Sequence, residues 1–142
     1  MKLTFVYLLV FCFALQSNAF AQKTTIVHKD KDGNTIGTSV QDGNKTTEKD
    51  KYGNTTGYST QGKNKTTFKD KYSNTTGSST QDKNKTTYHD KYGNTTGYTT
   101  QYKNRETYRD KYGNAKGSSV QNGKTKILKD KNGNTIGTDR QQ

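Results

Sequence analysis

Polar, strand-forming runs alternate with turn residues along nearly the whole chain, and this pattern repeats every twenty residues. Each repeat contains a turn of the form Asp-Lys-x-Gly-Asn, and the six copies begin at Asp30, Asp50, Asp70, Asp90, Asp110 and Asp130. Asp accepts bonds from the backbone two residues on, and Gly at the fourth place allows a positive φ, so each copy predicts a hairpin with a type I turn and a bulge. Ser73 stands in the Gly place of one copy, which predicts the weakest turn there.

A second turn lies half a period later and usually reads Gln-x-x-Asn, as in residues 61–64. Asn tolerates the left-handed conformation, so this turn again predicts a three-residue bulged loop, between Gln61 and Lys65. In the last copy, Asn122-Gly123 predicts a two-residue turn. The runs between turns are rich in Thr, Tyr and Ser, which favours strands, and they show no helical periodicity. We therefore expect an all-β fold, a repetitive antiparallel β-hairpin meander of six 20-residue repeats.

A β-solenoid is the alternative that uses the same repeats. Each unit would then form one coil, and like residues would stack in ladders, as Asn54, Asn74 and Asn94 illustrate. The meander is favoured because the turn chemistry at both positions reverses the strand, whereas a solenoid corner only bends it. In both arrangements each unit contacts only its neighbours, so stability grows with the number of repeats.

The predicted turns also imply a register. If Lys49 faces Thr55 and Thr60 faces Thr66, paired residue numbers sum to an even value, and all even-numbered strand residues share one face. The odd-numbered face is then basic, and the even-numbered face carries the aromatic residues Tyr58, Phe68, Tyr88, Tyr98 and Tyr108. A flat sheet cannot hide these side chains, so we expect it to close into a sandwich or barrel, or to use them for self-association in a homo-oligomer or fibril.

The first 21 residues have the pattern of a secretion signal. Lys2 is followed by an apolar run over 3–15, and Ala19-Phe20-Ala21 fits the small-x-small cleavage rule. The run is too short for a stable membrane anchor, so no membrane span is expected once the signal is removed. This predicts a single β-repeat domain over 22–142 that is secreted, extracellular or on the cell surface, with the periplasm as the other location. The one cysteine, Cys12, lies in the signal, so the domain has no disulfide and no thiolate metal site.

Composition alone is compatible with disorder, because the chain is poorly hydrophobic and has a formal net charge of +12. Strands are favoured instead by three features: the turn residues recur at a constant spacing of twenty, Thr and Tyr are abundant, and proline is absent. The positive net charge predicts anionic partners.

Residue types needed for catalysis or metal binding are not grouped in the sequence. His28 and His89 lie in different repeats, and both are interpreted as solvated strand residues. The acidic residues occur singly between lysines, so paired carboxylates for acid–base chemistry are missing. Residues 30–34 faintly resemble a calcium loop but lack the third acidic position and the distal Glu. We therefore predict no catalytic site, no metal site and no cofactor, and the protein is not expected to be an enzyme.

A lysine followed by a tyrosine recurs at the predicted loop tips. These pairs are predicted to bind surfaces, because the charge attracts anionic partners and the ring adds contact area; they are Lys51 and Tyr52, Lys71 and Tyr72, Lys91 and Tyr92, and Lys111 and Tyr112. The leading hypothesis is a secreted structural or adhesive protein that binds an anionic surface, polysaccharide or matrix, or assembles with its own copies. A nucleic-acid or anionic-polysaccharide binding module is the alternative. An ice-binding Thr array is less favoured, because Lys65 and Lys69 flank Thr67.

Residues 86–97 and 106–114 resemble the tandem units of small secreted bacterial proteins, which read Thr-Thr-Tyr-x-Asp-x-x-Gly-x-x-x-Gly. These units are similar in turn to the YD repeats of rearrangement-hot-spot proteins and teneurins. The resemblance implies a spiral of β-hairpins over the whole mature chain.

Overall fold

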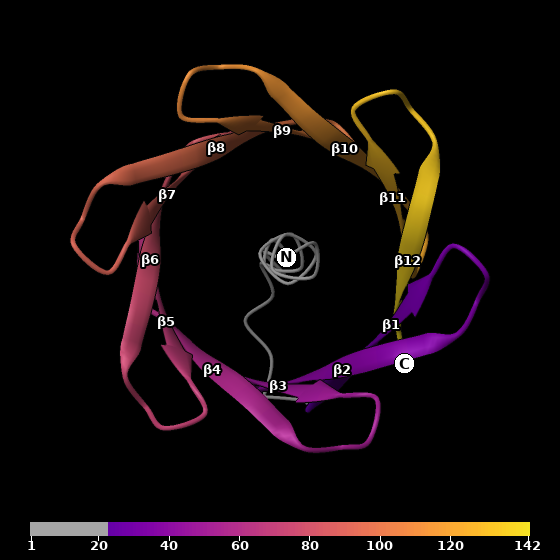
Figure 1. Ribbon diagram of the computed structural model, residues 1–142, viewed down its shortest axis with the longest axis horizontal. Coiled ribbons are helices and arrows are strands. Elements are labelled where there is room, and N and C mark those ends of the chain that lie inside the picture. The colour runs from indigo at the N-terminus through magenta and orange to yellow at the C-terminus, as the bar shows by residue number, and fades with distance from the viewer. Residues whose placement is uncertain (1–22) are drawn as a thin grey trace.

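The computed structural model describes residues 23–142, which form twelve antiparallel strands closed into a barrel (Figure 1). Each strand pairs with its neighbours along the chain, and β1 pairs with β12 to close the ring. The strands are β1 (Thr24–Asp30), β2 (Thr35–Asp42), β3 (Lys45–Asp50), β4 (Thr55–Gln61), β5 (Lys65–Asp70), β6 (Thr75–Asp82), β7 (Lys85–Asp90), β8 (Thr95–Tyr102), β9 (Arg105–Asp110), β10 (Ala115–Asn122), β11 (Thr125–Asp130) and β12 (Thr135–Gln141). The predicted all-β hairpin meander is confirmed, and it closes into a barrel rather than coiling as a solenoid. The predicted signal, residues 1–21, lies outside the described residues.

The first turn of each repeat has the predicted geometry. In the β3–β4 turn, the Gly53 amide donates to the Asp50 carbonyl at 3.0 Å, and the Asp50 amide donates to the Asn54 carbonyl at 2.9 Å. Gly53 has a φ of +86°, and Ser73 takes the same left-handed conformation with a φ of +71°. These contacts define a type I turn followed by a left-handed residue, so the prediction for these six turns is confirmed.

The second turns are tighter than predicted in four repeats. Asp42 pairs with Lys45, which leaves a two-residue loop, and Gln61 pairs with Thr66 and not with Lys65. In the last copy a two-residue loop forms as predicted, but it consists of Gly123 and Lys124, one residue later than the predicted Asn122-Gly123. The residue with positive φ is the first loop residue, as in Lys83 at +52°, and not the Asn that the sequence suggested. A two-residue loop follows the right-handed twist of the flanking strands better than the longer loop, which accounts for the difference.

A further bulge in every even-numbered strand changes the register. Lys49 pairs with Thr55 as predicted, but Glu48 then pairs with Gly57 and not with Thr56, so Thr56 is an extra residue on β4. The equivalent register shift occurs in β2, β6, β8, β10 and β12. Paired numbers beyond each bulge therefore sum to an odd value, and the predicted sharing of one face by all even-numbered residues is wrong.

The buried face of the barrel consists of even-numbered residues on odd-numbered strands and odd-numbered residues on even-numbered strands. The even-numbered strands contribute small residues to it, such as Gly57 and Ser59 on β4, and the odd-numbered strands contribute larger ones, such as Tyr88 on β7. Gly57 lies so close to β5 that a Cβ there would stand 2.7 Å from the Lys69 carbonyl oxygen. The six glycines at this place in the repeat thus allow a close approach of neighbouring backbones.

The predicted basic face lies on the outside of the barrel. Odd-numbered residues of the odd-numbered strands point outward, which places Lys65, Lys85 and Arg105 there. The five aromatic residues proposed for self-association do not share a face, because Phe68, Tyr88 and Tyr108 lie on the buried side while Tyr58 and Tyr98 lie on the outer side. On the outside, the Lys45 and Lys85 ammonium groups lie 4.6 Å and 4.5 Å from the ring centroids of Tyr58 and Tyr98.

Candidate functional site

Six loops at one end of the barrel flare outward around the ring (Figure 1). In the β3–β4 loop, Asp50 Oδ1 accepts bonds from the Tyr52 and Asn54 amides at 2.9 Å, and Oδ2 accepts one from Asn54 Nδ2 at 3.0 Å. The Asn54 side chain is the main cause that lowers the pKa of the Asp50 carboxyl group, with the backbone amides adding to it. The carboxylate is therefore directed into its own loop, and the neighbouring lysine is the charge that the loop presents outward.

Four of these loops carry the predicted lysine–tyrosine pairs. The tyrosine side chains are 73–78% exposed, and in each pair the lysine ammonium lies 4.9 Å from the ring centroid; the pairs are Lys51 and Tyr52, Lys71 and Tyr72, Lys91 and Tyr92, and Lys111 and Tyr112. One face of each ring is thus occupied by a cation, and the rest of the ring is free to make contact. In the first loop, Asp32 replaces the tyrosine and pairs with Lys31 at 2.8 Å.

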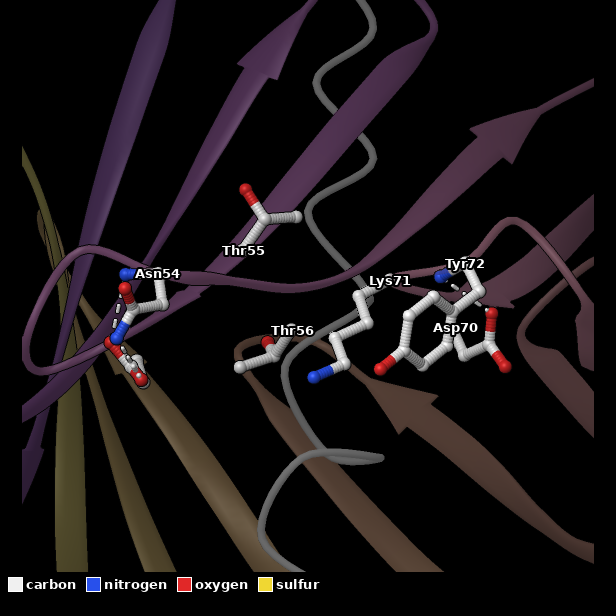
Figure 2. Close-up of a pocket in the computed structure, with 7 residues that line it drawn as sticks. Asn54, Thr55, Thr56, Asp70, Lys71 and Tyr72 are labelled. Atoms are coloured by element: carbon white, nitrogen blue, oxygen red, sulfur yellow. Dashed lines mark hydrogen bonds between the residues drawn. The ribbon is translucent and has the colours of Figure 1, made fainter.

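A groove of about 600 Å³ lies between two of these loops (Figure 2). It is lined by Asp50, Asn54, Thr55, Thr56, Asp70, Lys71 and Tyr72. Figure 2 shows Lys71 and Tyr72 extending together into it, on the side opposite Asn54. The groove therefore presents threonine hydroxyls, an ammonium and a phenol to the same ligand, a set that suits a hydroxylated or anionic chain more than an apolar one.

A second group of polar residues is buried where β12 meets β1. His28 Nδ1 lies 2.8 Å from Asp139 Oδ1, His28 Nε2 lies 2.6 Å from Ser39 Oγ, and the Ser39 hydroxyl donates to Glu48 Oε2 at 2.5 Å. His28 is only 5% exposed, so its interpretation as a solvated residue is wrong. Position 28 is an even-numbered residue of an odd-numbered strand, and such residues face the inside of the barrel.

His89 differs from His28 in its surroundings. It lies on the outer side of β7, is half-buried, and its Nε2 is 3.4 Å from Thr80 Oγ1. Its Nδ1 is buried and has no hydrogen-bond partner. The two histidines are thus separate groups on opposite faces of the sheet.

The Asp139–His28–Ser39 contacts have the connectivity of a catalytic triad, which the sequence analysis had excluded for lack of parts. Ser39 is, however, only 2% exposed, and its hydroxyl also contacts Glu48. Its backbone belongs to a strand paired on both sides, so no free amides stand beside it to stabilise an oxyanion. The geometry instead lets a proton be shared along the row from Glu48 through Ser39 to His28.

The protons in this row can be counted from its hydrogen bonds. An ionised Asp139 only accepts, so His28 Nδ1 donates to it. If Ser39 donates to Glu48, His28 Nε2 must donate to Ser39, and the imidazole is then cationic. If Glu48 holds the proton instead, each donor direction in the row reverses. Both arrangements contain the same number of protons, and burial raises the pKa of the Glu48 carboxyl group, which favours retention of that proton.

A third cluster lies on the buried face of β9, β10 and β11. Glu106 Oε2 accepts bonds from the Tyr108 hydroxyl at 2.7 Å, from Lys126 Nζ at 3.0 Å and from Ser119 Oγ at 3.1 Å. Burial, followed by the charge of Glu106, raises the pKa of the Tyr108 phenol, so it remains a donor. Lys126 is also the register partner of Asp139, which places the two buried clusters side by side.

These buried residues could have been found from departures in the repeat. Position 28 of the first repeat corresponds to Glu48, Phe68, Tyr88, Tyr108 and Leu128 in the following repeats. Position 39 corresponds to Ser59, Ser79, Thr99, Ser119 and Asp139. The middle repeats hold uncharged residues at both places, and the charged ones lie in the repeats near the two ends. A charge at a position that is elsewhere uncharged was the available signal.

Comparisons with known proteins give no family, since no family model, no curated protein and no solved structure matches the chain. Within residues 23–142, no group of three or more His, Cys, Asp or Glu side chains is placed to hold a metal ion. No helix in that part of the chain has the length and apolar character needed to cross a membrane.

Proposed function

We propose that the protein is a secreted structural or adhesive repeat protein that binds an anionic surface, polysaccharide or matrix. The observation that carries this proposal is the set of four exposed lysine–tyrosine pairs on loops that flare from one rim of the barrel (Figure 1). Each pair is a weak site by itself, because an exposed charge in water contributes little. Repetition on one closed ring makes the later contacts intramolecular, which raises the total affinity without any strong single site.

The loop geometry supports this role. The six turn aspartates direct their carboxylates into the loop backbone, so these oxygens are bonded within the loop and do not hold the tip lysines in close ion pairs. The tyrosines add contact area at a small loss of conformational entropy, since a tyrosine has only two side-chain torsions. The groove beside Lys71 and Tyr72 extends the contact from the loop tip to the threonine hydroxyls of β4 (Figure 2).

Retention on a sulfated-polysaccharide column, eluted with a salt gradient, tests the proposal. The variant replaces Lys51, Lys71, Lys91 and Lys111 by Gln. We expect it to elute at markedly lower salt, because fewer screened ionic contacts remain. The matched control replaces the four exposed lysines of the opposite rim, Lys63, Lys83, Lys103 and Lys124, by Gln and removes the same charge. An equal loss in both variants would assign retention to total charge and refute a role for the loops.

A nucleic acid is the second candidate ligand. In each pair the lysine covers one face of the exposed tyrosine ring, and the other face is available for base stacking. Replacing Tyr52, Tyr72, Tyr92 and Tyr112 by Leu separates the two ligands. A polysaccharide-binding rim should lose little affinity, whereas affinity for single-stranded DNA should fall steeply, since stacking contributes about 1–3 kcal/mol per base. If both affinities are unchanged, the tyrosines take no part in binding.

A further inference from the structure

The ring closes where the two ends of the described chain meet, and it does so through residues unlike those at the other repeat boundaries. At each boundary an even-numbered strand pairs with the next odd-numbered strand, and the inward residues in the middle of the two strands face each other. The facing pairs are Ser39–Glu48, Ser59–Phe68, Ser79–Tyr88, Thr99–Tyr108 and Ser119–Leu128 inside the chain, and Asp139–His28 at the closure. Among these six inward pairs of residues 23–142, the closure is the one in which an acid faces a base.

The repeats are nearly identical, so the Asp139–His28 pair is a feature by which the closing strands differ from the other strands. Backbone hydrogen bonds alone would let β12 pair with β3, β5 or β7 as well as with β1, because the repeats share length and turn chemistry. Each of those pairings puts the buried Asp139 against a wrong partner. On β3 it would face the acid Glu48, and on β5 or β7 it would face the aromatic rings of Phe68 or Tyr88. A buried charge without its partner is strongly destabilising, so these pairings are disfavoured.

We propose that the Asp139–His28 pair selects β1 as the partner of β12, and that these two strand edges are also the surface through which a second copy of the chain binds when the ring opens. The pair fixes which strands meet but not whether they belong to one chain. An opened ring exposes the β12 edge of one copy and the β1 edge of another, which are complementary in register and in charge. Such a contact is head-to-tail, so it extends into larger rings or open assemblies. This proposal does not depend on the surface-binding role.

The selection is tested by making the closure resemble an internal boundary. The variant H28Y/D139S reproduces the Ser79–Tyr88 pair, so both side chains already occur at equivalent places in this barrel. We expect strand content to persist in circular dichroism, and we expect a larger share of oligomers than the wild type gives at the same concentration in size-exclusion chromatography with light scattering. The control Y88L makes an internal boundary like Ser119–Leu128, where a covalent turn already selects the partner, and should give the same share of oligomers as the wild type. An H28Y/D139S protein that is no more oligomeric than the wild type would overturn the proposal.

A second measurement keeps the proposal testable if that variant fails to fold. Lys29 and Thr138 are register partners across the closure, and the domain contains no other cysteine. The variant K29C/T138C retains Asp139 and His28 and is refolded under oxidising conditions at increasing protein concentration. We expect an intramolecular disulfide at low concentration and disulfide-linked dimers and multimers at high concentration. Oligomers that form without any disulfide between copies would show that the chains associate elsewhere, and would refute the closure as the docking surface.

Discussion

Replacing Gly97 by Ala tests the close packing of neighbouring strands on the buried face. An ideal Cβ at Gly97 would stand 2.5 Å from the Arg109 carbonyl oxygen and 3.5 Å from the Asp110 Cα. The obstacle is backbone and not a flexible side chain, and β9 is held by pairing on both of its edges. The two strands must therefore separate by roughly 0.7 Å or more before a normal contact distance is restored.

Such a separation weakens several hydrogen bonds between β8 and β9 at once. Overpacking of this kind destabilises proteins by about 1–3 kcal/mol, and we expect Gly97→Ala to lower the free energy of unfolding by about 2 kcal/mol. For a domain of this size, that corresponds to a fall in melting temperature of roughly 6–10 °C. Thermal unfolding followed by circular dichroism measures it directly.

Gly93→Ala is the matched comparison, since it makes the same chemical change four residues earlier. Gly93 has a φ of +88° and nothing within 4 Å of its ideal Cβ position, so the substitution introduces backbone strain but no clash. We expect a smaller loss of about 1 kcal/mol. If Gly97→Ala is as stable as the wild type, or more stable than Gly93→Ala, the close approach of β8 and β9 is not present in solution.

Three further predictions concern other parts of the barrel. Ser73→Gly should stabilise the protein by about 1 kcal/mol in thermal unfolding, because Ser73 holds a positive φ; an unchanged melting temperature would contradict this. Lys126→Met should destabilise it by about 3–5 kcal/mol in urea unfolding, because Glu106 is then buried without its partner, and adding Glu106→Leu should recover most of the loss. Burial raises the pKa of the Glu48 carboxyl group. The protonated group therefore contributes fully to the free energy of unfolding below the ordinary glutamate pKa, and this contribution is lost as pH rises through the raised pKa. Glu48→Gln should flatten the dependence of the free energy of unfolding on pH between about pH 4 and pH 8, and an unaltered pH profile would contradict the raised pKa.

The first turn of each repeat could be predicted from sequence because its geometry is local. Asp50 makes its bonds within five residues, and Gly53 supplies the positive φ without help from the rest of the fold. The same reasoning placed Lys51 and Tyr52 at an exposed tip, where the structure has them. Turn chemistry therefore gave both the hairpin meander and the position of the surface residues.

Which side chains of each strand point into the barrel could not be predicted from turn chemistry. This depends on one extra residue in each even-numbered strand, such as Thr56, which moves the later side chains of that strand to the other face. The tighter second turn then restores the original alternation on the next strand. The available signal was Gly57, a glycine that recurs every twenty residues and belongs to neither turn. Its cause is a contact with the Lys69 carbonyl on the neighbouring strand, and such a contact is invisible until the strands are paired. The predicted aromatic face failed for this reason.

Closure depends on the same bulges in a different way. A bulge bends its strand and increases the local twist, so six equivalent bulges bend the sheet in the same sense at regular intervals. Curvature is therefore a property of every repeat, and the residues of the repeat set how many are needed to complete a turn. The identity of the closing strands is not a property of the repeat, because identical units would pair equally well at any boundary. It requires residues that differ between the units, and Asp139 and His28 are such residues, placed on the two strands that meet.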